Sequence, residues 1–423
     1  MAFGTLPGVM ASRGPAAGAL ADVRSTSSPR IRRWHSALII VEVGISVTLL
    51  VGGVLLTRSL VTLMQTDIGV RRDHVLTAKL SLSSGVFSQP SRVTVFLTRA
   101  LSAIEATPGV RSTGIVSSLP PNASQMHTSL SLPSRATGQP VDVAVEVVGA
   151  SPSLFATLGV PLIAGRPFTI ADTERAARVL ILSATAARRM FPEGDAIGHT
   201  VPFGSGETAA SDPEVVGIVG DVRYSGLDAA PDGAIYLPYP QRVFKSTYLV
   251  VRTSGDPESA SSSIRRAVLA LEPTIGFSDV RPLDVVVSDA VAQPRFRTWL
   301  LMLLGGLAVV MAAVGLYGVL SYAVAQRTSE IGIRLALGAS SADVLIMIVK
   351  HGLALTGAGI VMGATAAYLL SRMLAAFLYG IGPTDPLSFV LASAFIILIG
   401  AAATLVPARR ATGVDPLRAL RTP

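Results

Sequence analysis

The sequence predicts a membrane protein with four transmembrane α-helices, one before and three after a large inserted extracytoplasmic α+β domain. Three observations predict this class. Half of the 423 residues are hydrophobic and only 15% are charged, whereas soluble domains carry roughly 25% charged residues. Four apolar runs are each long enough to cross a bilayer as a helix, which takes about 20 residues. A long segment with alternating strand and helix patterns separates the first run from the other three.

The four apolar runs contain almost no charge. The first, Ser36–Thr57, contains only Glu42 as a charged residue. The other three, Trp299–Ala325, Gly352–Ser371 and Pro386–Pro407, contain no charged residue. The first run also starts too late, and is too long, to be the hydrophobic part of a cleavable signal peptide. We therefore expect four transmembrane helices, at residues 36–60, 297–325, 352–375 and 386–407.

Basic residues mark one side of the predicted membrane. Five arginines precede the first run, four follow the last, and the turn between the third and fourth runs contains no Lys or Arg. The positive-inside rule then places both termini in the cytoplasm. The predicted cytoplasmic parts are residues 1–35, 326–351 and 408–423, and residues 61–296 face outward. The net charge of +8 is explained by these flanks, so we expect no nucleic-acid partner.

The outward segment has the pattern of an α+β domain with its own core. A helix is expected over 90–106, and a second begins with Asp256 as N-cap and Pro257 at the first helical position. Asp221 and Arg223 lie in a turn after a strand, where we expect a surface ion pair, with a ligand contact as the alternative. Runs rich in β-branched residues predict strands at 75–82, 110–118, 143–150, 178–182, 214–222 and 248–253.

No pattern predicts an active site. The sequence has no Cys, which excludes disulfides, thiolate metal sites and Cys nucleophiles. Its five histidines are dispersed, and no GxxxxGK[ST] motif is present, so the chain has no P-loop for nucleotide hydrolysis. We expect no catalytic, cofactor-binding or metal site in it.

Two features inside the predicted spans stand out. Glu42 is an intramembrane acid, which could be an interface anchor, a helix-packing or coupling contact, or a proton relay. Gly359, Gly363 and Ala367 recur every four residues and form a small-residue face that allows close approach of another helix. That face predicts helix packing or a dimer contact.

The segment RTSEIGIRLALGAS, residues 327–340, separates two apolar runs. Glu330 and Arg334 have the spacing that supports a helix, which we expect to end near Gly338. Ser340 and Asp343 form an S-x-x-D start for the next helix. The short helix could lie on the bilayer surface or dock a cytoplasmic partner, and its pattern alone does not separate these alternatives.

This segment resembles the cytoplasmic segment of the MacB/FtsX-like ABC transporter permeases. The resemblance implies a permease subunit of the bacterial inner membrane that transmits the ATP-driven motion of a cytoplasmic ATPase to a periplasmic domain, for efflux or extraction of a substrate. Further motifs resemble the same family in order: SPSLFATLGVPLIAGRPFT (151–169), FPEGDAIGHTV (191–201), EVVGIVGDVRYSGL (214–227), YGIGPTDPLSF (379–389) and VPARRATGVDPLRALR (406–421).

The resemblance also implies partners. A cytoplasmic ABC ATPase acting in trans would hold the ATP and Mg, since no cofactor-binding site is expected in this chain. A second permease half or a homodimer, a periplasmic adaptor and membrane lipids are the other expected partners. Two alternatives stay open: an FtsX-like regulator of a periplasmic cell-wall hydrolase, and an orphan membrane receptor without an ATPase. The implied ATPase-docking residues are Glu330, Ile331, Gly332, Arg334, Ala336, Leu337 and Gly338.

The first residues of the chain resemble its last ones. With Pro7 aligned on Pro407, Ala19 meets Ala419 and Leu20 meets Leu420. Since the family includes duplicated permeases, we expect residues 1–35 to contain the remnant of a preceding repeat, and the chain to correspond to the C-terminal half of such a permease.

Overall fold

The chain folds into two compact units, and each is described by itself. One comprises residues 62–293, here the core unit, and the other comprises residues 1–61 with 294–423, here the helical unit. The predicted class, four long apolar helices in a one-plus-three arrangement with a mixed α+β domain, is confirmed. The computed structural model describes residues 29–82, 89–121, 126–133, 140–203, 212–242, 244, 246–326 and 340–412.

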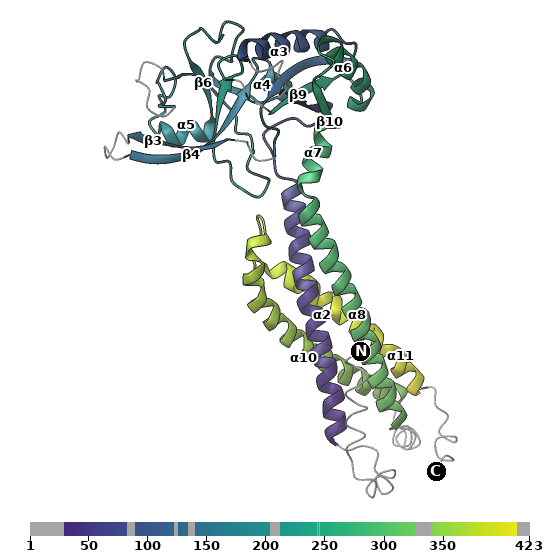
Figure 1. The fold of residues 1–423 in the computed structure, drawn as a ribbon. Helices are drawn as coiled ribbons and strands as arrows, with labels where there is room; N and C mark the ends of the chain where they lie inside the picture. Colours follow the sequence, from purple (N-terminus) through teal and green to yellow (C-terminus); the bar gives the residue numbers. More distant parts are fainter. Residues whose placement is uncertain are drawn as a thin grey trace, which may run out of the picture. The chain divides into compact units, whose positions relative to one another are not determined.

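The helical unit is built on four long helices (Figure 1). Each is long and apolar enough to cross a membrane, by length and composition. A short 3₁₀ turn, η4 (Ala375–Phe377), follows the third of them. The four helices are α2 (Pro29–Met64), α8 (Ala292–Gln326), α10 (Ser341–Leu374) and α11 (Pro386–Thr412).

Helix α10 begins earlier than the apolar run predicts. It starts at Ser341, so residues 341–351, expected to be part of the cytoplasmic segment, belong to the helix. The cause is a capping box, in which the Ser340 side chain accepts from the Asp343 amide and the Asp343 side chain accepts from the Ser340 amide. The S-x-x-D pattern therefore marks the start of the helix correctly.

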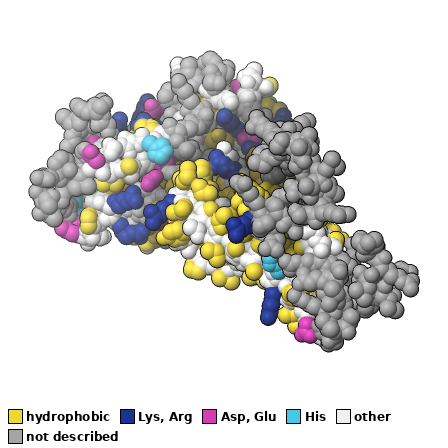
Figure 2. Space-filling view, turned by 90° about the horizontal axis from the view of Figure 1, so that it is seen from below, with side chains coloured by type: hydrophobic (Ala, Val, Ile, Leu, Met, Phe, Trp, Pro, Cys, Tyr) yellow, Lys and Arg dark blue, Asp and Glu magenta, His cyan; other side chains and the backbone are white. Residues whose placement is uncertain are grey.

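The four helices differ in how much of their apolar surface is buried. In its most apolar window, α2 is 56% buried within the protein, against 33% for α10 and 22% for α8 and α11. Helix α2 is thus the most enclosed helix of the unit. Hydrophobic side chains gather in a broad patch on the molecular surface (Figure 2). Exposed large side chains of the other three helices include Trp299, Leu303, Val310, Val361, Leu369 and Leu398.

The core unit contains one ten-stranded sheet, with the strand order β10-β1-β9-β2-β4-β8-β6-β7-β5 and β3 paired to β4. Its helices are α3 (Pro90–Glu105), α4 (Leu154–Leu158), α5 (Ala184–Met190), α6 (Pro257–Leu271) and α7 (Leu283–Ala290). Its strands are β1 (Val75–Ser81), β2 (Val110–Val116), β3 (His127–Pro133), β4 (Pro140–Ala150), β5 (Leu162–Gly165), β6 (Val179–Ser183), β7 (Glu214–Val219), β8 (Ala234–Pro238), β9 (Ser246–Thr253) and β10 (Gly276–Pro282).

Four of these strands form a ferredoxin-like frame. β1–α3–β2 and β9–α6–β10 are two βαβ units, and the order β10-β1-β9-β2 is antiparallel throughout, as in a split βαβ fold. Helices α3 and α6 pack together over this sheet (Figure 1). Their buried side chains, among them Leu97, Ile104, Ile264 and Val268, belong to the main apolar cluster of the unit.

The other six strands lie between β2 and β9 in the sequence. This insertion extends the same sheet, since β4 pairs with β2 as well as with β8. Helix α4 packs on β2 and β9, where the Thr157 hydroxyl donates to the Thr113 carbonyl at 3.0 Å. The extension therefore continues the frame as one sheet.

The polar turn at Asp221 and Arg223 departs from expectation. Asp221 accepts from the amide of Thr185 at 2.7 Å and from its hydroxyl at 2.8 Å, and it pairs with Arg188 at 3.4 Å. Arg223 instead donates to the carbonyls of Asp67 and Ala229. Asp221 therefore makes a surface ion pair, but with Arg188 and not with Arg223, because the two side chains bind different neighbouring segments.

We predict that Gly69→Ala destabilises the core unit more than Gly194→Ala. Both glycines have a positive φ, +79° and +87°, and a left-handed conformation costs another residue about 1–2 kcal/mol. A β-carbon at Gly69 would also lie 1.9 Å from the Asp221 carbonyl oxygen, whereas nothing lies within 4 Å at Gly194. Thermal unfolding of the purified full-length variants should show the larger fall for Gly69→Ala. Equal falls would contradict the tight packing of this loop on the 221–223 turn.

Candidate coupling site in the helical unit

The predicted ATPase-docking residues, Glu330, Ile331, Gly332, Arg334, Ala336, Leu337 and Gly338, lie outside the described residues, as does the predicted repeat remnant up to residue 28. The flanks of the docking segment are described. Helix α8 ends at Gln326 and α10 begins at Ser341. The segment therefore joins two long helices of the helical unit, and its docking role stays a prediction.

Glu42 lies at a contact between two helices. A β-carbon on Gly315 of α8 would be 2.6 Å from Oε2 of Glu42, so the carboxyl group of α2 lies directly against the α8 backbone. The Ser46 hydroxyl donates to the Glu42 carbonyl at 2.8 Å, which is a bond within α2. The Glu42 carboxyl group therefore lies at the α2–α8 contact, and its role stays a prediction.

The small-residue face of α10 lies against α2. A β-carbon on Gly363 would lie 2.4 Å from the Gly44 carbonyl oxygen and 2.8 Å from Cβ of Val47. One turn earlier, a β-carbon on Gly359 would lie 2.6 Å from Cβ of Val43. Ala367, the next residue of the series, is buried. The two backbones therefore approach too closely for any side chain at Gly363.

A hydroxyl group links the two helices at the same place. Thr48 of α2 lies with its Oγ1 2.8 Å from the Gly44 carbonyl oxygen and 3.1 Å from that of Gly363. The single hydroxyl proton can thus serve an acceptor on either helix. In an apolar surrounding such a bond is retained, because water does not compete for the donor.

A second set of contacts holds the loop between α10 and α11. Arg58, near the end of α2, donates from its guanidinium to the carboxylate of Asp385. The Tyr379 amide donates to the Ser59 hydroxyl at 2.7 Å. These contacts join residues about 320 positions apart in the sequence. We name Arg58, Ser59, Tyr379 and Asp385 the loop clamp.

Helix α8 reaches the same loop. The Arg297 guanidinium carbon lies 4.9 Å from the centroid of the Phe377 ring, within the range of a cation–π contact. Phe377 is the last residue of η4, and Tyr379 of the loop clamp follows it two residues later. The loop is therefore held by both helices that connect the helical unit to the core unit along the chain.

Asp385 has two roles in the loop clamp. Besides pairing with Arg58, it accepts from the amide of Ser388 at 2.9 Å and from its hydroxyl at 2.6 Å, at the start of α11. The hydrogen bond from the Ser388 hydroxyl, followed by the one from Arg58, holds the pKa of Asp385 below its usual value. The carboxylate thus caps one helix while binding another.

The four helices line a small cavity. That cavity, lined by residues including Val43, Leu316, Thr356 and Gly400, has a volume of about 10 Å³, too small to hold a water comfortably. Buried hydroxyls donate to carbonyls of their own helices, as Thr356 does to Gly352 and Thr404 to Ala401.

Within the described ranges, no group of three or more His, Asp or Glu residues could hold a metal ion.

Sequence reasoning missed the loop clamp. The available signal was Asp385 directly before Pro386, which is an N-cap followed by proline at the first helical position. That pattern identifies a helix start, but it does not identify Arg58 as the partner.

Comparison with protein families identifies both units. Residues 36–267 match the MacB-like periplasmic core domain, and residues 302–416 match the FtsX-like permease C-terminal family. The periplasmic region of MacB from Actinobacillus actinomycetemcomitans, a solved structure, is 17% identical, with a TM-score of 0.35, and the match covers 54% of this chain and 98% of that one.

Several relatives are export proteins by name. A probable export ATP-binding/permease protein of Pseudomonas fluorescens is 24% identical over 66% of this chain and 44% of its own length. The probable syringafactin export ATP-binding/permease protein of Pseudomonas syringae is 28% identical over 66% and 42%. A macrolide export ATP-binding/permease protein of Yersinia pestis is 26% identical over 66% and 44%. The chain thus spans less than half the length of these relatives.

We predict that Gly363→Ala destabilises the helical unit and that Gly357→Ala does not. The added methyl group at Gly363 would meet the α2 backbone, whereas nothing lies within 4 Å of the corresponding position at Gly357. Overpacking of this kind costs about 1–3 kcal/mol. Thermal unfolding of both variants in the same detergent provides the measurement. A Gly363→Ala variant as stable as Gly357→Ala would contradict close α2–α10 packing.

We also predict a graded effect at Asp385. Asp385→Ala should destabilise more than Asp385→Asn, because Asn keeps an oxygen for the helix cap, which is worth about 1 kcal/mol. The pKa of Asp385 is lowered in the folded protein, so its stabilisation is present above the unfolded pKa and is lost as pH falls through the folded pKa. The stability difference between wild type and Asp385→Asn should therefore narrow on acidification. A difference that is constant with pH would rule out the charge pair.

Proposed function

The chain belongs to the family of permeases with a MacB-like periplasmic core domain and an FtsX-like C-terminal region, and we propose that it is the membrane subunit of an ABC transporter. In this proposal, a cytoplasmic ATPase acts on the segment 326–340, and the helical unit transmits its ATP-driven motion to the core unit for efflux or extraction of a substrate. The family resemblance that the sequence motifs predict is confirmed by the two matches.

The observation that carries the proposal is the set of contacts that hold α2. Its face contacts α10 at Gly44 and Gly363, and its end is held through Arg58 and Asp385. Helix α2 ends at Met64, where the chain enters the core unit, and α8 begins at Ala292, where it returns. A displacement of α10 and α11 thus acts on the two helices that continue into the core unit.

The ATP-binding partner is inferred from two facts. The relatives are named ATP-binding/permease proteins, and this sequence contains no P-loop. We therefore assign ATP and Mg binding to a partner ATPase. The charge asymmetry of the flanks supports placing the segment 326–340 and both termini in the cytoplasm, and the core unit in the periplasm.

Export is the activity that the relatives' names share. They name compounds as different as a macrolide and syringafactin, at similar identity to this chain. The shared element is therefore outward movement rather than one substrate. The small cavity between the four helices supports a mechanism in which the substrate does not pass through the helical unit.

We predict that an ABC ATPase co-purifies with the full-length chain from gently solubilised native membranes, and that Arg334→Glu abolishes this association. The reversal places a negative charge on the proposed docking segment. A matched control is Arg266→Glu on the exposed face of α6, where Arg266 is hydrogen-bonded only within its own helix. Mass spectrometry of the captured proteins provides the measurement.

Each other outcome points to a different conclusion. Capture of a cell-wall hydrolase through the core unit, with no ATPase, would replace the proposal with a regulator. Absence of any ATPase from wild type and variants would leave a receptor without an energy source. An ATPase retained by Arg334→Glu would move the docking site away from residues 326–340.

A further inference from the structure

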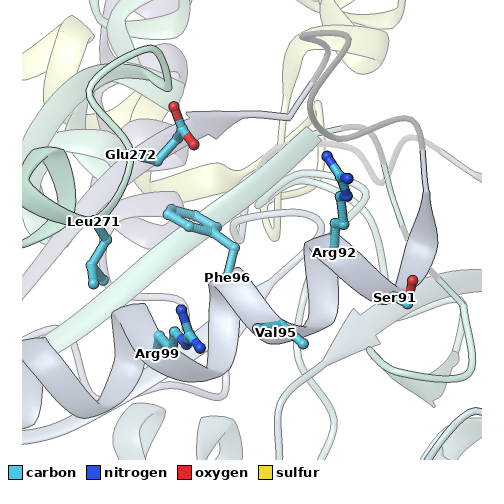
Figure 3. Close-up of a pocket in the computed structure, with 7 residues that line it drawn as sticks. All are labelled: Ser91, Arg92, Val95, Phe96, Arg99, Leu271 and Glu272. Atoms are coloured by element: carbon cyan, nitrogen blue, oxygen red, sulfur yellow. The ribbon is translucent and has the colours of Figure 1, made fainter.

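The core unit has a pocket between α3 and the end of α6 (Figure 3). Its volume is about 320 Å³, roughly ten times the ~30 Å³ that one water occupies in the liquid. It therefore has room for a ligand of roughly ten non-hydrogen atoms. The described residues that line the pocket all belong to the ferredoxin-like frame, and neither family match assigns it a role.

Two arginines lie on the α3 side of the pocket. Arg92 and Arg99 are seven residues apart, so they project from the same face of α3 about 10 Å apart along its axis. Within the described residues, neither has a hydrogen bond or an ion pair with another side chain. Other arginines of this unit do pair: Arg166 with Asp172, Arg188 with Asp221 and Arg281 with Asp279.

Apolar side chains lie between the two arginines and on the facing helix end. The Phe96 ring is buried and continues the main core outward into the pocket (Figure 3). Val95 is 51% exposed and Leu271, the last residue of α6, is 40% exposed. These two side chains leave apolar surface open to solvent beside a cationic pair. A ligand that covered them would remove that surface from water.

The remaining charged residue limits the charge of a ligand. Glu272 follows Leu271, and its Oε1 accepts from the Thr274 hydroxyl at 2.5 Å. This carboxylate is therefore already hydrogen-bonded within its own turn. Two arginines and one glutamate give the pocket a net charge of +1, which a single anionic group would balance.

We propose that this pocket binds a small amphiphilic anion. The anionic head group pairs with the guanidinium group of Arg92 or of Arg99, each of which suits a planar carboxylate or a related oxyanion. The hydrocarbon part lies over Phe96, Val95 and Leu271. The site is independent of the ATPase proposal, because every residue in it belongs to the core unit.

The test uses the full-length protein in phosphatidylcholine nanodiscs with a photoreactive octanoate, an amphiphile of about the size that the pocket holds. After irradiation, mass spectrometry locates the label. We expect it on α3 or on residues 268–274. Octanol and octylamine test the charge as competitors, and acetate tests whether the head group is sufficient. Only unlabelled octanoate should compete efficiently.

Variants connect the label to the pocket. The double variant Arg92→Gln/Arg99→Gln should weaken the apparent affinity about tenfold, since the head group then loses its charge-assisted hydrogen bond. Val95→Glu places a carboxylate beside the exposed apolar surface and should abolish labelling. Because Val95 is exposed, misfolding of the variant would not explain a loss of labelling. Arg266→Gln, on the same helix as Leu271 but outside the pocket, is the control and should label like wild type.

Four outcomes would overturn the proposal. Label outside α3 and residues 268–274 would place the site elsewhere. Competition by octanol equal to that by octanoate would mean that the arginines play no part, and competition by acetate alone would mean simple anion binding. Unchanged labelling in Val95→Glu, with an unfolding midpoint equal to wild type, would likewise exclude this pocket.

Discussion

The close approach of α2 and α10 is the contact on which the helical unit depends. Lipid tails are as apolar as the side chains of the helices, so the hydrophobic effect gives two membrane helices little reason to associate. Backbone proximity and interhelical hydrogen bonds take its place. At Gly363, a glycine on α10 meets the Gly44 carbonyl, and the Thr48 hydroxyl lies within reach of both carbonyls. A methyl group at Gly363 would separate the helices and weaken both effects.

This contact explains why the loop clamp matters. Packing at Gly363 sets the distance between α2 and α10. The bonds from Arg58 to Asp385 and from Tyr379 to Ser59 fix the position along the axis. Asp385 also caps α11 through Ser388, so the proposed movement of α11 would act on α2 through this residue. One contact sets spacing and the other sets register.

Much of the fold could be predicted from the sequence, because it depends on local patterns. Four apolar runs identified the four helices, and the Ser340–Asp343 and Asp256–Pro257 patterns identified two helix starts. Strands β3, β5, β8 and β10 were missed. β5 and β8 are too short for a clear alternation and lie among Gly and Pro, whereas β3 and β10 contain few β-branched residues. The loop clamp could not be predicted, because its partners are about 320 residues apart. The docking residues lie outside the described residues, so their role rests on the resemblance alone.

The topology of the core unit determines where a movement of α2 or α8 enters it. The chain passes from α2 into β1, and it leaves from β10 through α7 into α8. β1 and β10 are neighbouring antiparallel strands, paired from Leu76–Pro282 to Ser81–Gly276, and the Thr77 hydroxyl adds a bond to the Arg281 carbonyl. A displacement of one helix relative to the other therefore acts on a single pair of strands. Helix α6 packs on β1, β9 and β10, whereas α3 packs on β2. Shear between these strands would change the distance between α3 and α6, and with it the pocket that Arg92, Arg99 and Leu271 line.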